Sequence, residues 1–113
     1  MKQYTTPEQT AKLIKLGFER PENGVIKQLL DRSTGLWITI GEEGGYSIGE
    51  LIEMLMTIKG VKISFEAMFG GRLKLIVKRL VGDKWDILYG NVSKELTDLL
   101  FDAIVKLKEG EVI

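Results

Sequence analysis

The chain has 113 residues, and its 16 basic and 16 acidic side chains give a formal net charge of zero, while histidine and cysteine are both absent. These two side chains most often carry catalysis or bind transition metals near neutral pH. Their absence excludes a disulfide framework and a thiolate metal site. We therefore expect a protein that is not an enzyme and that has no catalytic residues, cofactor or metal.

The composition, with 44% hydrophobic and 28% charged residues, is that of an ordinary globular protein. The first seven residues carry one charge and no apolar stretch, and no run approaches the about 18 apolar residues of a membrane span. A zero net charge also creates no global field toward nucleic acid or an anionic membrane. We expect one soluble, cytoplasmic domain over residues 1–113 that makes no contact with a membrane.

The first two predicted helices have complete start signals. Thr6 is the expected N-cap of the first, with proline following it and Gln9 completing a capping box, and Gly17 ends the helix. Ser47 and Glu50 form the same kind of box at the start of the second, which is predicted to run to residue 60.

A third helix is predicted from about Ser93 to Gly110. Its apolar residues recur at the spacing of one helical face. They are Leu96, Leu99, Leu100, Ala103, Ile104 and Leu107.

Alternating apolar and polar residues predict strands between these helices. The expected strands cover residues 25–30, 36–40, 61–69, 73–81 and a return from residue 85 to residue 89. The order is α-β-β-α-β-β-β-α. Antiparallel hairpins with one apolar face need helices on that face. We therefore predict an α+β domain of two layers, with three helices on an antiparallel sheet of about five strands.

Strand register follows from keeping apolar residues on one face. Three-residue loops at the last two hairpins pair Phe69 with Leu73 and Val81 with Trp85, whereas two-residue loops would turn lysines toward the core. In this register Trp85 points to the core and Arg79 lies on the apolar side. The other expected pairs are Ala67 with Leu75, Phe65 with Val77 and Val77 with Tyr89.

Basic residues are concentrated between residues 72 and 84, next to Trp85. Basic side chains interleaved with an aromatic on a sheet are typical of single-strand nucleic-acid binding. The competing interpretation is a solvated strand face whose lysines prevent edge pairing. We favour the solvated face because Trp85 is expected in the core and the net charge is zero. The residues of the nucleic-acid alternative are Arg72, Lys74, Lys78 and Lys84.

The third helix carries two further candidate surfaces. Glu95, Asp98 and Asp102 share one side, and we interpret them as a solvated face because Asp102 can pair with the lysine four residues later. The alternatives are binding of a divalent cation or contact with a basic partner. Phe101 and Val105 flank the apolar stripe. They either widen the buried face or form a protein interface, and we predict a weak or stable homodimer through this helix edge or through an exposed sheet edge.

The glycine-rich segment 41–45 lies between a predicted strand and a helix, which is the order of a phosphate-binding loop. It carries two glutamates and lacks the lysine that such a loop needs. We interpret the segment as a flexible connector; the alternative is a weak cation site at the two glutamates.

Three segments carry a resemblance to known proteins: residues 6–14 (TPEQTAKLI), 46–55 (YSIGELIEML) and 102–109 (DAIVKLKE). Together they resemble small uncharacterised proteins of phages and mobile elements in gut Bacteroidetes. The resemblance implies no activity, cofactor or site residue. We therefore expect a small non-catalytic protein-binding or accessory protein of a phage or mobile element, acting on a partner that is not identified. The alternative is a nucleic-acid-binding module that uses the basic sheet surface.

Overall fold

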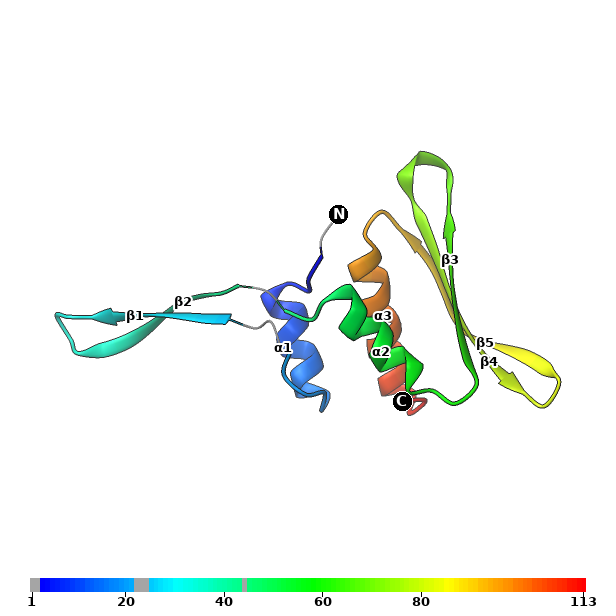
Figure 1. Ribbon diagram of the computed structural model, residues 1–113, viewed down its shortest axis with the longest axis horizontal. Coiled ribbons are helices and arrows are strands. Elements are labelled where there is room, and N and C mark those ends of the chain that lie inside the picture. Colours follow the sequence, from blue (N-terminus) through cyan, green and yellow to red (C-terminus); the bar gives the residue numbers. More distant parts are fainter. Residues whose placement is uncertain (1–2, 22–24, 44) are drawn as a thin grey trace.

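The computed structural model describes residues 3–21, 25–43 and 45–113 (Figure 1). It contains helices α1 (Pro7–Lys15), α2 (Ile48–Met56) and α3 (Leu96–Glu109), strands β1 (Val25–Asp31), β2 (Leu36–Glu43), β3 (Val61–Ala67), β4 (Leu73–Val81) and β5 (Lys84–Ser93), and a short 3-10 turn, η1 (Phe69–Gly71). The predicted α+β class with three helices is confirmed. No helix within the described ranges is long and apolar enough to cross a membrane.

The strands form two separate antiparallel sheets, so the prediction of one sheet of about five strands is wrong. Among the described residues, β1 pairs with β2, and β3, β4 and β5 form a second sheet in that order. Figure 1 shows the β1–β2 hairpin projecting away from the helices, on the side opposite the three-stranded sheet. The molecule is accordingly elongated, with extents of 65 × 33 × 18 Å. Alternation within a strand indicates its two faces but does not determine which hairpins join edge to edge.

The starts of α1 and α2 are the predicted capping boxes. Thr6 Oγ1 accepts from the Gln9 amide at 3.2 Å, and the Thr6 amide donates to Gln9 Oε1 at 3.0 Å. The corresponding distances between Ser47 and Glu50 are both 3.1 Å. Gly17, with φ of 102°, ends α1 as predicted, whereas α2 stops at Met56, before the predicted end.

The start of α3 differs in detail from the prediction, whereas its end agrees with it. Ser93 remains in β5, and the helix has Glu95 as its N-cap without a side-chain cap. Gly110 is the C-cap, as predicted, and the residue after it, Glu111, adopts the left-handed conformation with φ of 59°. The strand keeps Ser93 because it pairs with Leu73 of β4.

A single apolar core joins the three helices to the three-stranded sheet. α3 packs against α2 and lies across β5 and β4, so that the helices cover one face of the sheet. The buried apolar residues are Leu13, Tyr46, Leu51, Leu55, Ile58, Leu75, Val77, Tyr89, Leu99, Leu100, Ala103, Ile104 and Leu107. The described apolar core thus covers only one side of the β3–β5 sheet.

The β3–β4 register differs from the prediction by two residues. Ala67 pairs with Leu73 and Phe65 with Leu75, so the connection spans residues 68–72 and contains η1. Phe69 therefore leaves the strand instead of pairing with Leu73. Because side chains alternate with a period of two, this shift keeps the predicted faces of both strands.

The β4–β5 register combines two offsets. Val77 pairs with Tyr89 as predicted, but Val81 pairs with Lys84 and Leu80 with Trp85, because a bulge shifts the register after Val77. The turn at residues 82–83 begins with a glycine at φ of 66°, which suits a two-residue hairpin loop. The predicted pair of Val81 with Trp85 is wrong, and the bulge turns Trp85 to the other face of the sheet.

The described residues of the glycine-rich segment 41–45 differ from the flexible connector that we predicted. Residues 41–43 belong to β2, Gly44 lies outside the described residues, and Gly45 is buried. An added Cβ at Gly45 would lie 2.6 Å from the Thr10 hydroxyl and from both the carbonyl and the hydroxyl oxygen of Thr5. Close contact with the start of α1 therefore requires glycine at this position.

Candidate functional site

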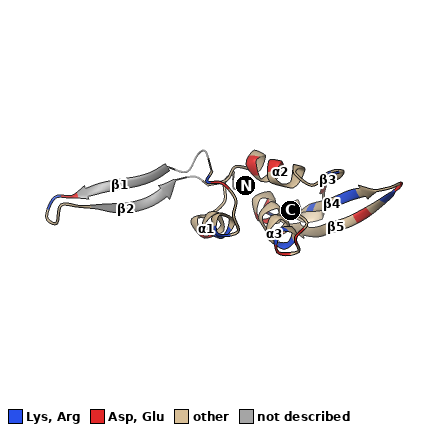
Figure 2. Ribbon diagram, turned by 90° about the horizontal axis from the view of Figure 1, so that it is seen from below, with Lys and Arg blue, Asp and Glu red and all other residues tan. Residues whose placement is uncertain are grey.

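The face of the three-stranded sheet that points away from the helices is a candidate binding surface, here called the open face. On β4, Leu75 and Val77 are fully buried under the helices, so the alternate positions point outward. Cross-strand pairing then places these residues on the open face: Lys62, Ser64, Glu66, Lys74, Ile76, Lys78, Leu80, Trp85, Ile87 and Val92. Figure 2 shows basic residues along β4.

Trp85 lies on the open face and not in the core. Its side chain is 48% exposed. The Nζ atoms of Lys78 and Lys62 lie 5.1 Å and 5.8 Å from the centroid of its ring, within the range of a cation–π contact. The prediction that Trp85 points to the core is therefore wrong. That prediction was one of our two reasons for interpreting the basic strand as a solvated face instead of a binding surface.

Positive charge is concentrated beside this indole. Lys62 and Lys78 are direct cross-strand partners, and like charges in this arrangement destabilise a sheet. Neither lysine forms an ion pair within the described part of the chain. Further along the same strands, Lys74 lies opposite Glu66, where the charges balance. The excess positive charge on the open face is thus centred on Trp85.

Apolar side chains complete the surface around Trp85. Its cross-strand partner Leu80 is 45% exposed, and Ile87, the partner of Lys78, is 69% exposed. Exposed apolar side chains grouped beside cations give a surface on which a flat ring can stack while a nearby anion is bound.

The sequence-predicted nucleic-acid residues do not all share this surface. Lys74 and Lys78 lie on the open face, whereas Arg72 lies in the β3–β4 connection and Lys84 lies at the exposed start of β5, opposite Val81. Arg79 is on the covered side as predicted and forms an ion pair of 3.5 Å with Asp86. The sequence interpretation missed Lys62, although the alternation of residues 61–69 already placed it among the polar positions.

The acidic side of α3 has structural partners. Asp98 Oδ1 accepts from Gln9 Nε2 at 2.9 Å, which ties α3 to α1. Asp102 Oδ2 accepts from the Tyr89 hydroxyl at 2.7 Å and forms the predicted pair with Lys106, at 3.2 Å. No group of three or more carboxylates that could hold a metal ion is found among the residues with described positions.

The Tyr89 hydroxyl is strongly perturbed by this arrangement. Burial and the hydrogen bond to Asp102 raise the pKa of Tyr89 well above its usual value. The side chain of Lys106 also lies 5.6 Å from the centroid of the Tyr89 ring. The cluster joins β5 to α3 and therefore stabilises the covered side of the sheet.

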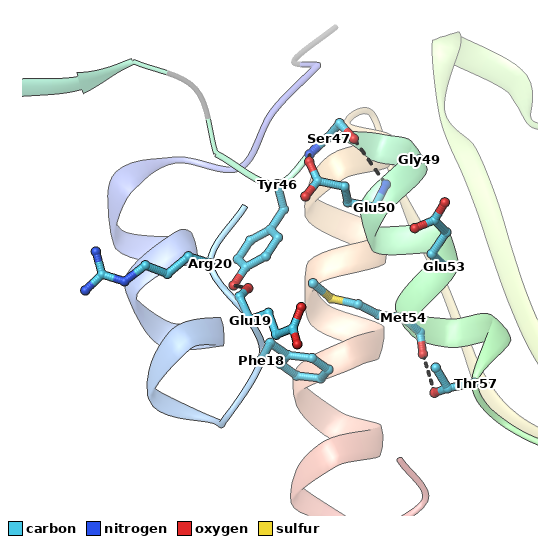
Figure 3. A pocket seen from close by; sticks show the side chains of 10 residues that line it. All are labelled: Phe18, Glu19, Arg20, Tyr46, Ser47, Gly49, Glu50, Glu53, Met54 and Thr57. Atoms are coloured by element: carbon cyan, nitrogen blue, oxygen red, sulfur yellow. Dashed lines mark hydrogen bonds between the residues drawn. The ribbon is translucent and has the colours of Figure 1, made fainter. Parts of the chain in front are cut away.

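A hollow of about 500 Å³ lies between α2 and the segment after α1 (Figure 3). The hydroxyl of Tyr46 joins the two elements by donating to the carbonyl of Glu19. Two further polar groups make contacts within α2: Glu50 belongs to its capping box, and Thr57 Oγ1 donates to the carbonyl of Met54. Burial raises the pKa of Tyr46. The remaining lining residues are Phe18, Arg20, Ser47, Gly49 and Glu53. We assign this hollow a structural role.

The candidate interface residues on α3 are half-buried. Phe101 and Val105 both pack against the apolar core, which agrees with the interpretation that they widen the buried face of the helix. Several large exposed apolar side chains lie on the three-stranded sheet and its loops, among them Phe69, Leu80, Val81, Trp85 and Ile87.

No protein-family model matches the chain, and the searches of curated proteins and of solved structures found no significant match. The residues of the open face are therefore the main indication of what this protein binds.

Proposed function

We propose that this protein is a non-catalytic binding protein whose open face binds single-stranded nucleic acid. The observation that carries the proposal is the half-exposed indole of Trp85 beside the ammonium groups of Lys62 and Lys78. An indole offers a stacking surface to any base, and ammonium groups beside it are placed to bind the flanking phosphates.

The charge arrangement supports an anionic ligand. Lys62 and Lys78 repel each other across β3 and β4. A bound phosphate would relieve this repulsion, so the two lysines gain more from an anion than two separated surface lysines would. This local field operates although the net charge of the chain is zero.

The shape of the surface favours single strands over duplexes. A stacking ring needs a base whose face is free, and duplex bases are already stacked on their neighbours. Stacking on one aromatic side chain contributes about 1–3 kcal/mol per base. One indole and a few lysines therefore predict modest affinity with a clear dependence on salt.

Binding of fluorescent dT and rU oligonucleotides, followed by anisotropy, tests the proposal. Trp85→Ala should weaken binding by about fivefold to 150-fold, which corresponds to the loss of one stacked base. Lys62→Gln with Lys78→Gln should weaken it further and reduce the slope of log K against log salt by about 0.7 for each lost phosphate contact. Lys15→Gln, an exposed lysine on α1, is the matched control and should bind like the wild type.

Two results would refute nucleic-acid binding at this face. One is a wild-type protein that binds neither oligonucleotide at micromolar concentration and low ionic strength. The other is a Trp85→Ala variant that retains wild-type affinity while its unfolding midpoint is unchanged.

A second candidate function is contact with a protein partner, which the exposed Leu80, Val81 and Ile87 support. Under this alternative the protein is an accessory protein of a phage or mobile element. Its partner could also be a second copy of the chain, in a homodimer that forms through Phe101 and Val105. Light scattering separates these alternatives. A mass above 12.7 kDa that Ile87→Lys reduces indicates pairing through the sheet, whereas a mass that only Phe101→Glu reduces indicates pairing through α3.

A further inference from the structure

The side chain of Phe69 is presented to solvent by an ordered turn. It is 96% exposed, at the tip of the β3–β4 connection. The Met68 amide donates to the Arg72 carbonyl at 2.7 Å and closes the loop, and Gly70 and Gly71 adopt φ of 78° and 73°. These positive φ angles suit glycine and fix the direction of the turn. Phe69 is thus held outward although burying its ring would be favourable.

Phe69 and Trp85 mark the two ends of the sheet. Figure 1 shows the β3–β4 connection and the β4–β5 turn at opposite ends of β4. Trp85 is the partner of Leu80, while Phe69 lies beyond Leu73. The strand between residues 73 and 80 measures about 23 Å at roughly 3.3 Å per residue. Lys74 and Lys78, both on the open face, lie along β4 between these two ends.

We infer that Phe69 is a second stacking position and that a bound single strand runs along β4 from Trp85 to Phe69. This inference rests on the proposed function of the open face. Each ring stacks one base, and the lysines between them contact the intervening phosphates. Arg72 adds a cation beside the second ring, because its Nε donates to the Phe69 carbonyl at 3.4 Å.

The separation of the two rings defines the class of ligand. At the about 3.4 Å rise of a stacked strand, a span of about 23 Å holds about seven nucleotides, and an extended strand covers it with fewer. Single-strand binding domains begin at about four nucleotides. The ligand is therefore a single strand with a footprint of about four to seven nucleotides.

A length series of oligo-dT, from two to twelve nucleotides, tests the inference with three proteins. Wild-type affinity should rise steeply up to a length between about four and seven nucleotides and then level off. Phe69→Ala should match the wild type on the shortest strands and lose about fivefold or more on strands that span both rings. Trp85→Ala should lose affinity at every length.

Two variants separate stacking from loop structure. Phe69→Tyr keeps an aromatic ring and should retain the wild-type length dependence. Met68→Ala removes an exposed, non-aromatic side chain from the same loop and should have no effect on affinity.

The outcomes distinguish this inference from the proposed function. If Phe69→Ala equals the wild type at every length while Trp85→Ala binds weakly, the second stacking position is wrong and the open face remains the binding site. If the wild type binds no strand of any length, both are wrong. Because Phe69 contributes little buried area, its variants should keep the wild-type unfolding midpoint, and that measurement accompanies each titration.

Discussion

Lys62 on β3 and Lys78 on β4 lie directly opposite each other, and both ammonium groups lie within 6 Å of the Trp85 ring centroid, at 5.8 Å and 5.1 Å. Packing alone does not favour two facing lysines, because like charges across a strand pair are destabilising. An anionic ligand would turn the same arrangement into an attraction. The lysine pair is therefore expected to lower the stability of the sheet while it favours the proposed binding of an anion.

Replacing one of these lysines with glutamate should raise stability and lower binding in the same variant. Lys62→Glu places a carboxylate opposite Lys78 and should increase the free energy of unfolding by about 0.2–1 kcal/mol, the range of cross-strand charge pairs. Denaturant unfolding measures this gain, and oligonucleotide titration measures the loss of affinity.

Lys74→Glu is the matched control for the sign of this effect. Lys74 lies opposite Glu66, so the variant creates a like-charge pair and should lower the unfolding free energy by a similar amount. A loss of stability in Lys62→Glu would contradict the cross-strand interpretation of these lysines.

The contact of Gly45 with the start of α1 predicts that no side chain larger than that of glycine is tolerated at position 45. Gly45→Ala places a Cβ 2.6 Å from three oxygen atoms of Thr5 and Thr10, and overpacking of this kind destabilises by about 1–3 kcal/mol. Gly49→Ala, on α2, meets only the Ser47 hydroxyl at 3.8 Å and should stabilise by up to about 1 kcal/mol. Thermal or denaturant unfolding of both variants checks the prediction. Equal midpoints would mean that Gly45 is not packed against Thr5.

The end of α3 offers a stabilising substitution. Glu111 has φ of 59°, and its neighbour Val112 donates to the Leu107 carbonyl at 2.8 Å in the pattern that usually has glycine at the left-handed position. Glu111→Gly should therefore raise the free energy of unfolding by about 0.5–1 kcal/mol. Glu111→Ala removes the same charge but keeps the unfavourable φ, and it should give no such gain. A gain of equal size in both variants would point to charge instead of backbone conformation.

The hydrogen bond between Tyr89 and Asp102 predicts a loss of stability at high pH. Burial and this bond raise the pKa of Tyr89 well above the usual value of about 10 for a tyrosine. The folded protein therefore holds the phenol proton more tightly than the unfolded chain, so stability is constant below about pH 10 and falls as pH rises further, while only the unfolded chain loses the proton.

Tyr89→Phe tests this linkage. Below pH 10 it should cost about 0.5–1.5 kcal/mol, the contribution of one hydrogen bond, and above pH 10 its stability should fall less steeply than that of the wild type. Asp102→Asn keeps a hydrogen-bond acceptor but removes the charge, so it should lower the pKa of Tyr89 part of the way toward the usual value for a tyrosine. Parallel stability profiles for Tyr89→Phe and the wild type from pH 9 to 12 would contradict the assignment.

Helix starts could be predicted from sequence because their causes are local. The pairs Thr6 with Gln9 and Ser47 with Glu50 join residues three positions apart, and such contacts form whatever the rest of the chain does. The start of α3 could not be predicted in the same way, because Ser93 pairs with Leu73 of β4, a contact between residues far apart in sequence.

The faces of β3 and β4 also followed from the sequence, since alternation with a period of two survives a two-residue error in register. The position of Trp85 did not. The turn at residues 82–83 favours one β4–β5 register, in which Val81 pairs with Lys84, whereas the buried pair of Val77 with Tyr89 requires a register that differs by one residue. A bulge after Val77 accommodates both registers, and it turns Trp85 outward. Sequence alternation alone therefore placed the tryptophan of the candidate site on the wrong face.

The amino-acid sequence by itself determined the α+β class, the three helices, the β4 strand and the apolar face of the sheet, because each depends on contacts between near neighbours. Only the tertiary structure decided that the β1–β2 hairpin stands apart from the other strands and that Trp85 joins Lys62 and Lys78 on the open face. Both features depend on how distant segments pack against one another, and a local pattern of polar and apolar residues is compatible with more than one such packing.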